Sequence, residues 1–126
     1  MKIRVYYEDT DTGGVVYHSN YINYCERARS EAFFARGMSP ALDSGHFVAR
    51  KLEADYFLSA KLGDLLEIKT ELIQMKAASF ELLQTIYRDD KKIFELKITL
   101  VYITLQGKPQ KINDEIKRLI LSLFET

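Results

Sequence analysis

The segment Glu8 to His18, EDTDTGGVVYH, concentrates the residues of this chain that could do chemistry. Three carboxylates, those of Glu8, Asp9 and Asp11, precede two glycines, and the segment ends on one of only two histidines in the chain. Such carboxylates could hold a metal ion, act as a base or nucleophile, or be solvated in a turn. The glycines could cradle a phosphate or permit a tight turn. The segment is therefore compatible with four interpretations: a metal site, a phosphate site, a plain turn or a catalytic carboxylate.

Metal and phosphate sites fit the segment poorly. Asp9, Asp11 and Gly14 fall at positions one, three and six of an EF-hand loop, but position twelve is Asn20 rather than a bidentate Glu. No lysine follows the glycines as in a P-loop. The two histidines lie far apart in sequence, so a zinc site lacks ligands. We therefore expect neither a metal nor another cofactor.

The context of the segment leaves a turn and a catalytic carboxylate both open. Asp and Gly supply tight backbone geometry, so a solvated turn accounts for the spacing. However, the apolar VVY run leads to His18 at the threshold of a predicted helix. Unpaired amides at a helix N-terminus stabilise negative charge that develops on an oxygen. Asp11 and the start of this helix could face the same carbonyl group.

The helix that follows must position His18. Ser19 or Asn20 can cap it, and it should end near Gly37 after about 16 residues, or about 24 Å. Its apolar stripe consists of Ile22, Cys25, Ala28 or Arg29, Ala32 and Phe33. The only cysteine lies on this stripe, so we expect it to pack rather than to react.

The rest of the chain is dominated by strand patterns. Ile3, Val5 and Tyr7 alternate with more polar neighbours, which is the period of a strand with one buried face. Further strands are predicted over 46–58, 64–74, 80–87 and 93–105. The joints at 76–79 and 88–91 are short, so the strands that they connect should be antiparallel neighbours. A final helix is predicted after a cap at Asn113.

These elements predict an α+β domain over residues 1–126, in which a curved antiparallel sheet wraps one long helix. A sheet of this kind leaves edge strands exposed. Pairing two sheets edge to edge would cover one edge of each. We therefore expect a homo-oligomer, a dimer at least.

Composition narrows the classes of partner. Eighteen basic residues balance eighteen acidic ones, so nothing in the net charge predicts a nucleic-acid or membrane partner. No apolar stretch approaches the roughly 18 residues that span a bilayer. The N-terminal MKIRVYYED lacks the apolar segment of a secretory signal, and a single cysteine fits a reducing compartment. We expect a cytoplasmic protein.

Several motifs together resemble a known family. They are Arg4-Val5, Thr10-Asp11, Gly14-Val15-Val16-Tyr17-His18, Asn20-Tyr21 and Glu26-Arg27-Ala28-Arg29. This pattern resembles the 4-hydroxybenzoyl-CoA thioesterase family, and most closely its YbgC-like acyl-CoA thioesterase branch. The resemblance implies the hotdog fold and hydrolysis of acyl-CoA thioesters without metal or redox cofactor. It also implies dimers or tetramers with active sites at subunit interfaces.

The resemblance also implies roles for individual residues. Asp11 matches the catalytic carboxylate, which acts as nucleophile or as general base for water. The backbone N–H of His18 matches the donor that polarises the thioester carbonyl. Tyr7 and the His18 side chain are candidates for orienting substrate or water, although Tyr7 could equally belong to the core. Gly14 and Tyr17 are expected to contact the substrate.

The CoA leaving group carries phosphates, which a neutral protein must bind with local cations. Lys76 and Ser79, in the turn at 76–79, are the first candidates by resemblance to related hotdog proteins. Further candidates for CoA contact are Lys61, Arg50 and Lys51, and those for an acyl tunnel are Phe33, Phe34 and Tyr56.

Two rival functions remain at this level. One is a non-catalytic module that binds acyl-CoA or acyl carrier protein. The other is a hotdog hydratase or dehydratase, which the sequence disfavours because it holds no pair of His and acid with the spacing of that family. The acyl group and the choice between CoA and carrier protein stay open.

Overall fold

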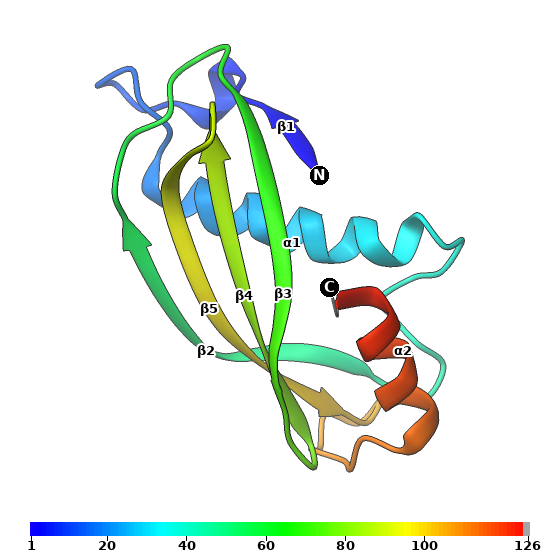
Figure 1. The fold of residues 1–126 in the computed structure, drawn as a ribbon. Helices are drawn as coiled ribbons and strands as arrows, with labels where there is room; N and C mark the ends of the chain where they lie inside the picture. Colours follow the sequence, from blue (N-terminus) through cyan, green and yellow to red (C-terminus); the bar gives the residue numbers. More distant parts are fainter. Residues whose placement is uncertain (125–126) are drawn as a thin grey trace.

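The computed structural model describes residues 1–124, which form a five-stranded sheet and two α-helices (Figure 1). The elements are β1 (Lys2–Arg4), the short 3-10 helix η1 (Tyr7–Asp9), α1 (His18–Phe34), β2 (His46–Tyr56), β3 (Leu65–Met75), β4 (Ser79–Arg88), β5 (Lys91–Ile103) and α2 (Asp114–Phe124). None of the helices in this range is long and apolar enough to cross a membrane.

The sheet is antiparallel throughout, with strand order β1-β3-β4-β5-β2. The two predicted hairpins, β3 with β4 and β4 with β5, are confirmed. Strand β2 does not pair with β3, the next strand in the sequence. It pairs with β5 instead, and β3 lies on the far side of β4, next to β1. Strands β1 and β2 are therefore the two edges.

Helix α1 lies in the curve of the sheet, as predicted (Figure 1). Its buried side chains are Tyr21, Tyr24, Cys25, Ala28 and Phe33. They meet the alternating buried face of β5, which consists of Phe94, Leu96, Ile98, Leu100 and Tyr102. Burial of apolar area contributes about 25 cal/mol per Å², so this contact between helix and sheet stabilises the fold. The predicted α+β architecture is confirmed.

The first strand is shorter than the period-two pattern predicts. Val5 is fully buried, but Tyr7 is 82% exposed and begins η1. The chain turns here because the carboxylate of Asp9 accepts the N–H of Tyr6, and the N–H of Asp9 returns to the carbonyl of Tyr6. The alternative that placed Tyr7 in the core is wrong.

Helix α1 also begins earlier than predicted. Its N-cap is Tyr17, with extended φ and ψ of −63° and 135°, and the cap uses no side-chain hydrogen bond. Ser19 or Asn20 as the cap is therefore wrong. Asn20 lies inside the first turn, and its side chain is used to bind the preceding loop.

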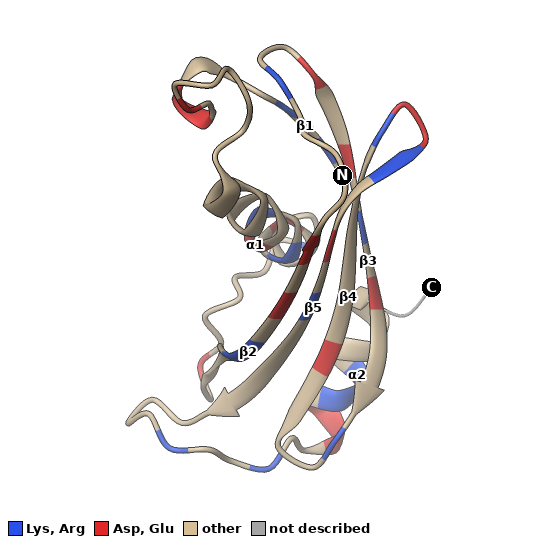
Figure 2. Ribbon diagram, turned by 90° about the vertical axis from the view of Figure 1, so that its left-hand side faces the viewer, with Lys and Arg blue, Asp and Glu red and all other residues tan. Residues whose placement is uncertain are grey.

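Helix α2 packs near the C-terminal half of α1 (Figure 1). The predicted cap is confirmed, since Oδ1 of Asn113 accepts the N–H of Ile116 at 2.9 Å. Phe124 lies in the core, with its ring centroid 6.2 Å from that of Phe33 and 6.3 Å from that of Phe80. Figure 2 shows acidic and basic residues interspersed along the strands and turns in view rather than gathered in one patch.

Candidate active site

Asp11 and His18, the two residues expected to face one carbonyl group, line the same cleft. Its volume is about 290 Å³. The lining comes from the loop before α1, the first turns of α1 and the end of β2 with the segment that follows it. The lining residues are Asp11, Val15, Val16, His18, Tyr21, Tyr56, Phe57, Leu58 and Ser59.

A tight loop holds the Asp11 carboxylate. The N–H of Asp11 donates to the carbonyl of Val15 at 2.9 Å, and the N–H of Gly14 donates to the carbonyl of Asp11 at 3.0 Å. Oδ1 of Asp11 accepts the N–H of Gly13 at 2.8 Å. Gly14 has a φ of +79°, which favours glycine at this position. The carboxylate is thus oriented while its other oxygen accepts no hydrogen bond from residues 1–124.

The two aspartates of this segment differ in burial. Asp11 is exposed in the single chain, whereas the neighbouring Asp9 is buried, with 6% of its surface exposed. The carboxylate of Asp9 accepts the N–H of Tyr6, so this residue serves the structure of the loop.

The start of α1 presents free backbone donors to the cleft. The first turn of an α-helix leaves its N–H groups without intrahelical acceptors. The N–H of Asn20 is bound to the carbonyl of Tyr17 at 2.9 Å, whereas those of His18 and Ser19 have no acceptor within the described range 1–124. Two amides and the positive end of the helix dipole are therefore available to an oxygen.

The carbonyl of Asp9 ties the loop to the helix. It accepts the N–H of Tyr17 and the side-chain amide of Asn20, both at 2.9 Å. This double contact fixes the distance between the Asp11 loop and the first turn of α1. Sequence reasoning missed it because an asparagine near a helix start indicates a cap equally well.

Tyr24 lies beneath this loop. Its hydroxyl oxygen is buried and has no hydrogen-bond partner in the part of the chain that the structure describes. Burial, and then the nearby carboxylate of Asp9, raise the pKa of the Tyr24 phenol above its ordinary value. The side chain is therefore a neutral packing group at neutral pH.

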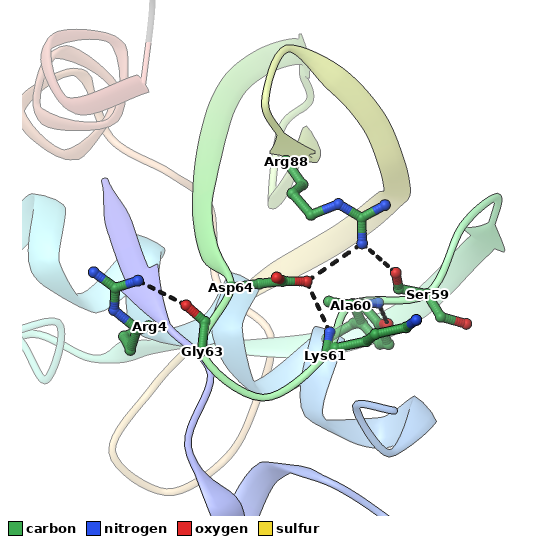
Figure 3. Close-up of polar contacts among 8 residues, drawn as sticks. Arg4, Ser59, Ala60, Lys61, Gly63, Asp64 and Arg88 are labelled. Carbon is green, nitrogen blue, oxygen red and sulfur yellow. Dashed lines mark hydrogen bonds and ion pairs between the residues drawn. The ribbon is translucent and has the colours of Figure 1, made fainter. Parts of the chain in front are cut away.

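The opposite wall of the cleft is the segment 57–64 between β2 and β3, which a polar network holds in place (Figure 3). The Arg88 guanidinium donates to the carbonyl of Ser59 and lies 3.4 Å from a carboxylate oxygen of Asp64. The same oxygen of Asp64 accepts the N–H of Lys61 at 2.8 Å. Arg4 donates to the carbonyl of Gly63 at 2.7 Å.

This wall is also joined to the helix and to the Asp11 loop. The N–H of Ala60 donates to the hydroxyl of Tyr21 at 2.9 Å, and the carbonyl of Ala60 accepts the N–H of Val16 at 2.9 Å. At the end of β2, the hydroxyl of Tyr56 donates to the carbonyl of His18 at 2.8 Å. Hydrogen bonds therefore connect all three sides of the cleft.

Three of the expected site residues do not line the cleft in the single chain, namely Tyr7, Gly14 and Tyr17. Tyr7 projects into solvent, and its carbonyl accepts the hydroxyl of Thr10. Tyr17 is 47% exposed, with its ring centroid 4.4 Å from that of His18. Gly14 shapes the loop. Among the tunnel candidates, Tyr56 lines the cleft, Phe33 lines another cavity and Phe34 is exposed.

Lys76 and Ser79 lie at the opposite end of the sheet. They flank the turn from β3 to β4, where the N–H of Lys76 donates to the carbonyl of Ser79. Strand β3, which starts beside β1 near the cleft, rises about 3.3 Å per residue, so this turn is about 33 Å from that end. Ser79 is also buried. One chain does not bring this pair to Asp11.

Cys25 is fully buried on the inner face of α1. Burial raises the pKa of its thiol to about 12. The expected packing role of this residue is therefore supported. Within residues 1–124, no group of three or more His, Cys, Asp or Glu side chains is arranged to hold a metal ion.

Comparison with known proteins identifies the family of this chain. The sequence model of the thioesterase-like superfamily matches residues 5–120. A Helicobacter pylori protein named acyl-CoA thioesterase YbgC is 52% identical over 87 residues, which are 69% of this chain and 65% of that protein. An Escherichia coli protein named acyl-CoA thioester hydrolase YbgC is 37% identical over 119 residues, covering 90% of this chain and 89% of that protein.

A solved structure, that of a probable thioesterase from Bartonella henselae, has a TM-score of 0.82 at 31% identity. The match covers 90% of this chain and 97% of that one. The curved antiparallel sheet around one long helix is a hotdog thioesterase fold, so the fold prediction is confirmed. This chain belongs to the thioesterase-like superfamily.

The polar network of the 57–64 wall generates a prediction. Arg88→Ala removes both contacts of the guanidinium and should lower the free energy of unfolding by about 1–2 kcal/mol, because hydrogen bonds from a partly exposed charge are screened. Urea unfolding measures this loss. The amide of Lys61 should also exchange faster with solvent, since its acceptor Asp64 loses a partner.

Arg36→Ala is the matched control, because Arg36 also donates to a backbone carbonyl, that of Ser122 in α2. It should lower stability without a local effect on Lys61. If both variants changed the exchange of the Lys61 amide equally, the proposed support of the cleft wall by Arg88 would be wrong.

Proposed function

We propose that this protein hydrolyses acyl-CoA thioesters, with Asp11 and the backbone amide of His18 as the reacting pair. The observation that carries the proposal is that an oriented carboxylate and an unpaired helix amide line one cleft. The names of the Helicobacter and Escherichia relatives support the same substrate class. This chain aligns with only 65% of the length of the Helicobacter protein, so the name of that protein does not by itself assign its activity to this chain. The proposal therefore rests also on the geometry of Asp11 and His18.

The amides would act on the thioester oxygen. When the carbonyl carbon is attacked, this oxygen gains negative charge, and donors already aimed at it stabilise that charge without reorganisation. The N–H of His18, with that of Ser19 beside it, occupies the helix N-terminus where such charge is favoured. One such donor contributes about 2.7–4 kcal/mol to transition-state stability.

Asp11 would supply the attack in one of two ways. Its free oxygen bonds to the carbonyl carbon, the C–S bond breaks, and CoA leaves as the thiolate, giving a mixed anhydride that water hydrolyses. Alternatively, the carboxylate takes a proton from water, the resulting hydroxide attacks the carbon, and the proton passes to the departing sulfur. A positioned base contributes roughly 10²–10⁴ in rate.

A second copy of the chain would complete the site. Strand β2 is a sheet edge that exposes Val48, Leu52 and Tyr56, and pairing two copies along it would cover these side chains. Ser79 lies opposite Val101, which lies opposite Val48, so the turn at Lys76 is at the Val48 end of the sheet. The cleft is at the Tyr56 end, where Tyr56 binds His18.

Antiparallel pairing of β2 with its copy aligns the Val48 end of one chain with the Tyr56 end of the other. The turn with Lys76 and Ser79 of a second copy would therefore reach the end of the molecule where Asp11 lies. Two strand spacings of about 4.8 Å separate β4 from β2, a distance that a CoA moiety can bridge. This arrangement supports Lys76 as a phosphate contact even though one chain keeps it remote.

Replacing the carboxylate tests the reaction directly. Asp11→Asn keeps the size of the side chain but removes the base or nucleophile, so kcat for acyl-CoA hydrolysis should fall roughly 10²–10⁴-fold. Thiol release from a panel of short, long and aromatic acyl-CoAs measures it. Glu8→Gln is the control, since Glu8 is exposed and does not line the cleft, and its kcat should stay unchanged. Full turnover by Asp11→Asn would refute the mechanism, and tight acyl-CoA binding without thiol release by the unmodified protein would indicate a binding module.

The amide of His18 can be removed separately from its side chain. Proline is tolerated at the first position of a helix, and the extended Tyr17 has φ and ψ that suit a residue before proline. His18→Pro should therefore fold yet lose about 10²–10³ in kcat, because the donor to the thioester oxygen is gone. His18→Ala keeps the amide and should lose far less. Equal losses in the two variants would assign the effect to the imidazole instead.

The oligomer has its own test. The unmodified protein should have a light-scattering mass of at least twice 14.6 kDa, and Leu52→Glu should reduce both that mass and the hydrolysis, because a charge enters the paired edge. Leu105→Glu is the control, as Leu105 is an exposed leucine outside the sheet edge. A catalytically active particle of 14.6 kDa would contradict the shared site.

A further inference from the structure

A second cavity, of about 320 Å³, lies between the C-terminal half of α1, the start of β2 and the end of α2. None of the residues that line it also lines the Asp11 cleft. His18 and Arg29 mark the two sites on α1, and eleven residues at about 1.5 Å each separate them by roughly 16 Å. The cavity is therefore a distinct site in this chain.

A half-buried cation, Arg29, lines this cavity. Its Nη1 group donates to the side-chain oxygen of Gln84 at 2.8 Å. Gln84 is fully buried, and its amide nitrogen donates to the carbonyl of Cys25 at 2.8 Å and to the hydroxyl of Thr70 at 3.1 Å. These bonds fix the amide orientation, so its oxygen always faces the guanidinium. Arg29 is consequently held in place by the core.

The charge of Arg29 is not compensated by a salt bridge. No carboxylate of residues 1–124 lies within 4.0 Å of its guanidinium nitrogens. Burial lowers the pKa of Arg29 below its ordinary value, which reflects the cost of desolvating the cation. The carboxylate of Glu26 acts on this charge from beyond salt-bridge distance, and an anion in direct contact with the guanidinium would offset the desolvation cost further.

The guanidinium also has donors to spare. It carries five N–H groups, and the one side-chain bond found for it in the described residues uses Nη1 alone. The buried side-chain atoms without partners in that range are the hydroxyl of Tyr24 and one oxygen of Glu67, so the spare donors of Arg29 are not sealed in the core. These donors keep some exposure, and Arg29 is one of the residues that line the cavity.

Much of the remaining cavity lining is apolar, with a cluster of four phenylalanines. Phe47 and Phe80 pack edge to face with centroids 5.2 Å apart, and Phe33 lies 6.4 Å from Phe47. Phe124 of α2 stacks on Phe80 at 6.3 Å. A floor of this kind suits a flat ring or a short alkyl chain.

Glu26 limits the charge of the ligand. It is exposed at the mouth of the cavity, where its carboxylate accepts the hydroxyl of Ser30 at 2.7 Å. It would repel a second negative charge, so a dianion such as a phosphate monoester is disfavoured. His46 lines the same cavity from β2 and is a further donor.

We infer that this cavity binds a small monocarboxylic acid with an aromatic or short apolar body, and that Arg29 receives its carboxylate while the phenylalanine cluster holds the body. The volume, at the low end for ligand pockets, admits such a molecule but not a whole CoA ester. The inference does not rest on the proposed hydrolysis, because Asp11 and His18 take no part in it.

The first test compares an acid with its neutral analogue on the unmodified full-length protein. Isothermal titration with 3-phenylpropanoate should give saturable binding at least about ten-fold tighter than with 3-phenylpropanamide, since a charge-assisted bond replaces a neutral one. Backbone NMR shifts should change at His46 and Phe47 rather than at Asp11. Equal affinities, absence of saturable binding, or shifts centred on Asp11 would each overturn the inference.

Two arginine variants test the residue itself. Arg29→Met should lower the affinity for 3-phenylpropanoate at least about ten-fold and leave that for the amide unchanged. Arg27→Met is the matched control, because Arg27 lies exposed on the same helix over the ring of Tyr24. Equal effects of the two variants would refute the role of Arg29. Arg29→Lys, which keeps the charge, should retain part of the preference for the acid, and the comparison on the unmodified protein stands even if Arg29→Met does not fold.

Discussion

The carbonyl oxygen of Asp9 is the contact on which the cleft depends. It accepts two hydrogen bonds, from the backbone of Tyr17 and from the side chain of Asn20, while the carboxylate of the same residue holds the turn at Tyr6. One buried residue thereby connects the end of β1, the Asp11 loop and the first turn of α1. These hydrogen bonds join the three segments and thereby position the exposed carboxylate of Asp11 relative to the helix amides.

The cleft and the cavity at Arg29 use the same helix in different ways. At its N-terminus, α1 offers backbone amides whose free donors follow from helix geometry itself. In its C-terminal half it offers a side-chain cation whose position depends on a buried glutamine from β4. The curved sheet supports both, since α1 packs in its curve (Figure 1), with the Asp11 cleft at the N-terminal end of the helix and the Arg29 cavity beside its C-terminal half.

Sequence reasoning succeeded where a local pattern carries the information. The alternation in β5, the burial of Cys25, Ala28 and Phe33 on α1 and the cap at Asn113 follow from periodicity and capping chemistry, which act between near neighbours. The buried face of α1 also contains Tyr21 and Tyr24, which the predicted stripe omits. Sequence reasoning failed at Tyr7 and Asn20, where a hydrogen bond between a side chain and the backbone overrides the strand or cap pattern. Tyr7 leaves the strand because Asp9 closes a turn, and Asn20 binds the loop instead of capping the helix.

The α+β class, the hairpins from β3 to β5 and the placement of Asp11 near the start of α1 can be predicted from the sequence, because each is encoded by spacing or by a motif within a short segment. The edge position of β2 beside β5, the distance of Lys76 from Asp11 and the position of Arg29 at an aromatic cavity with no salt bridge to residues 1–124 cannot. These features depend on which surfaces meet when the sheet closes around the helix. Long-range packing determines which surfaces come into contact, and the local periodicity of the sequence does not predict it.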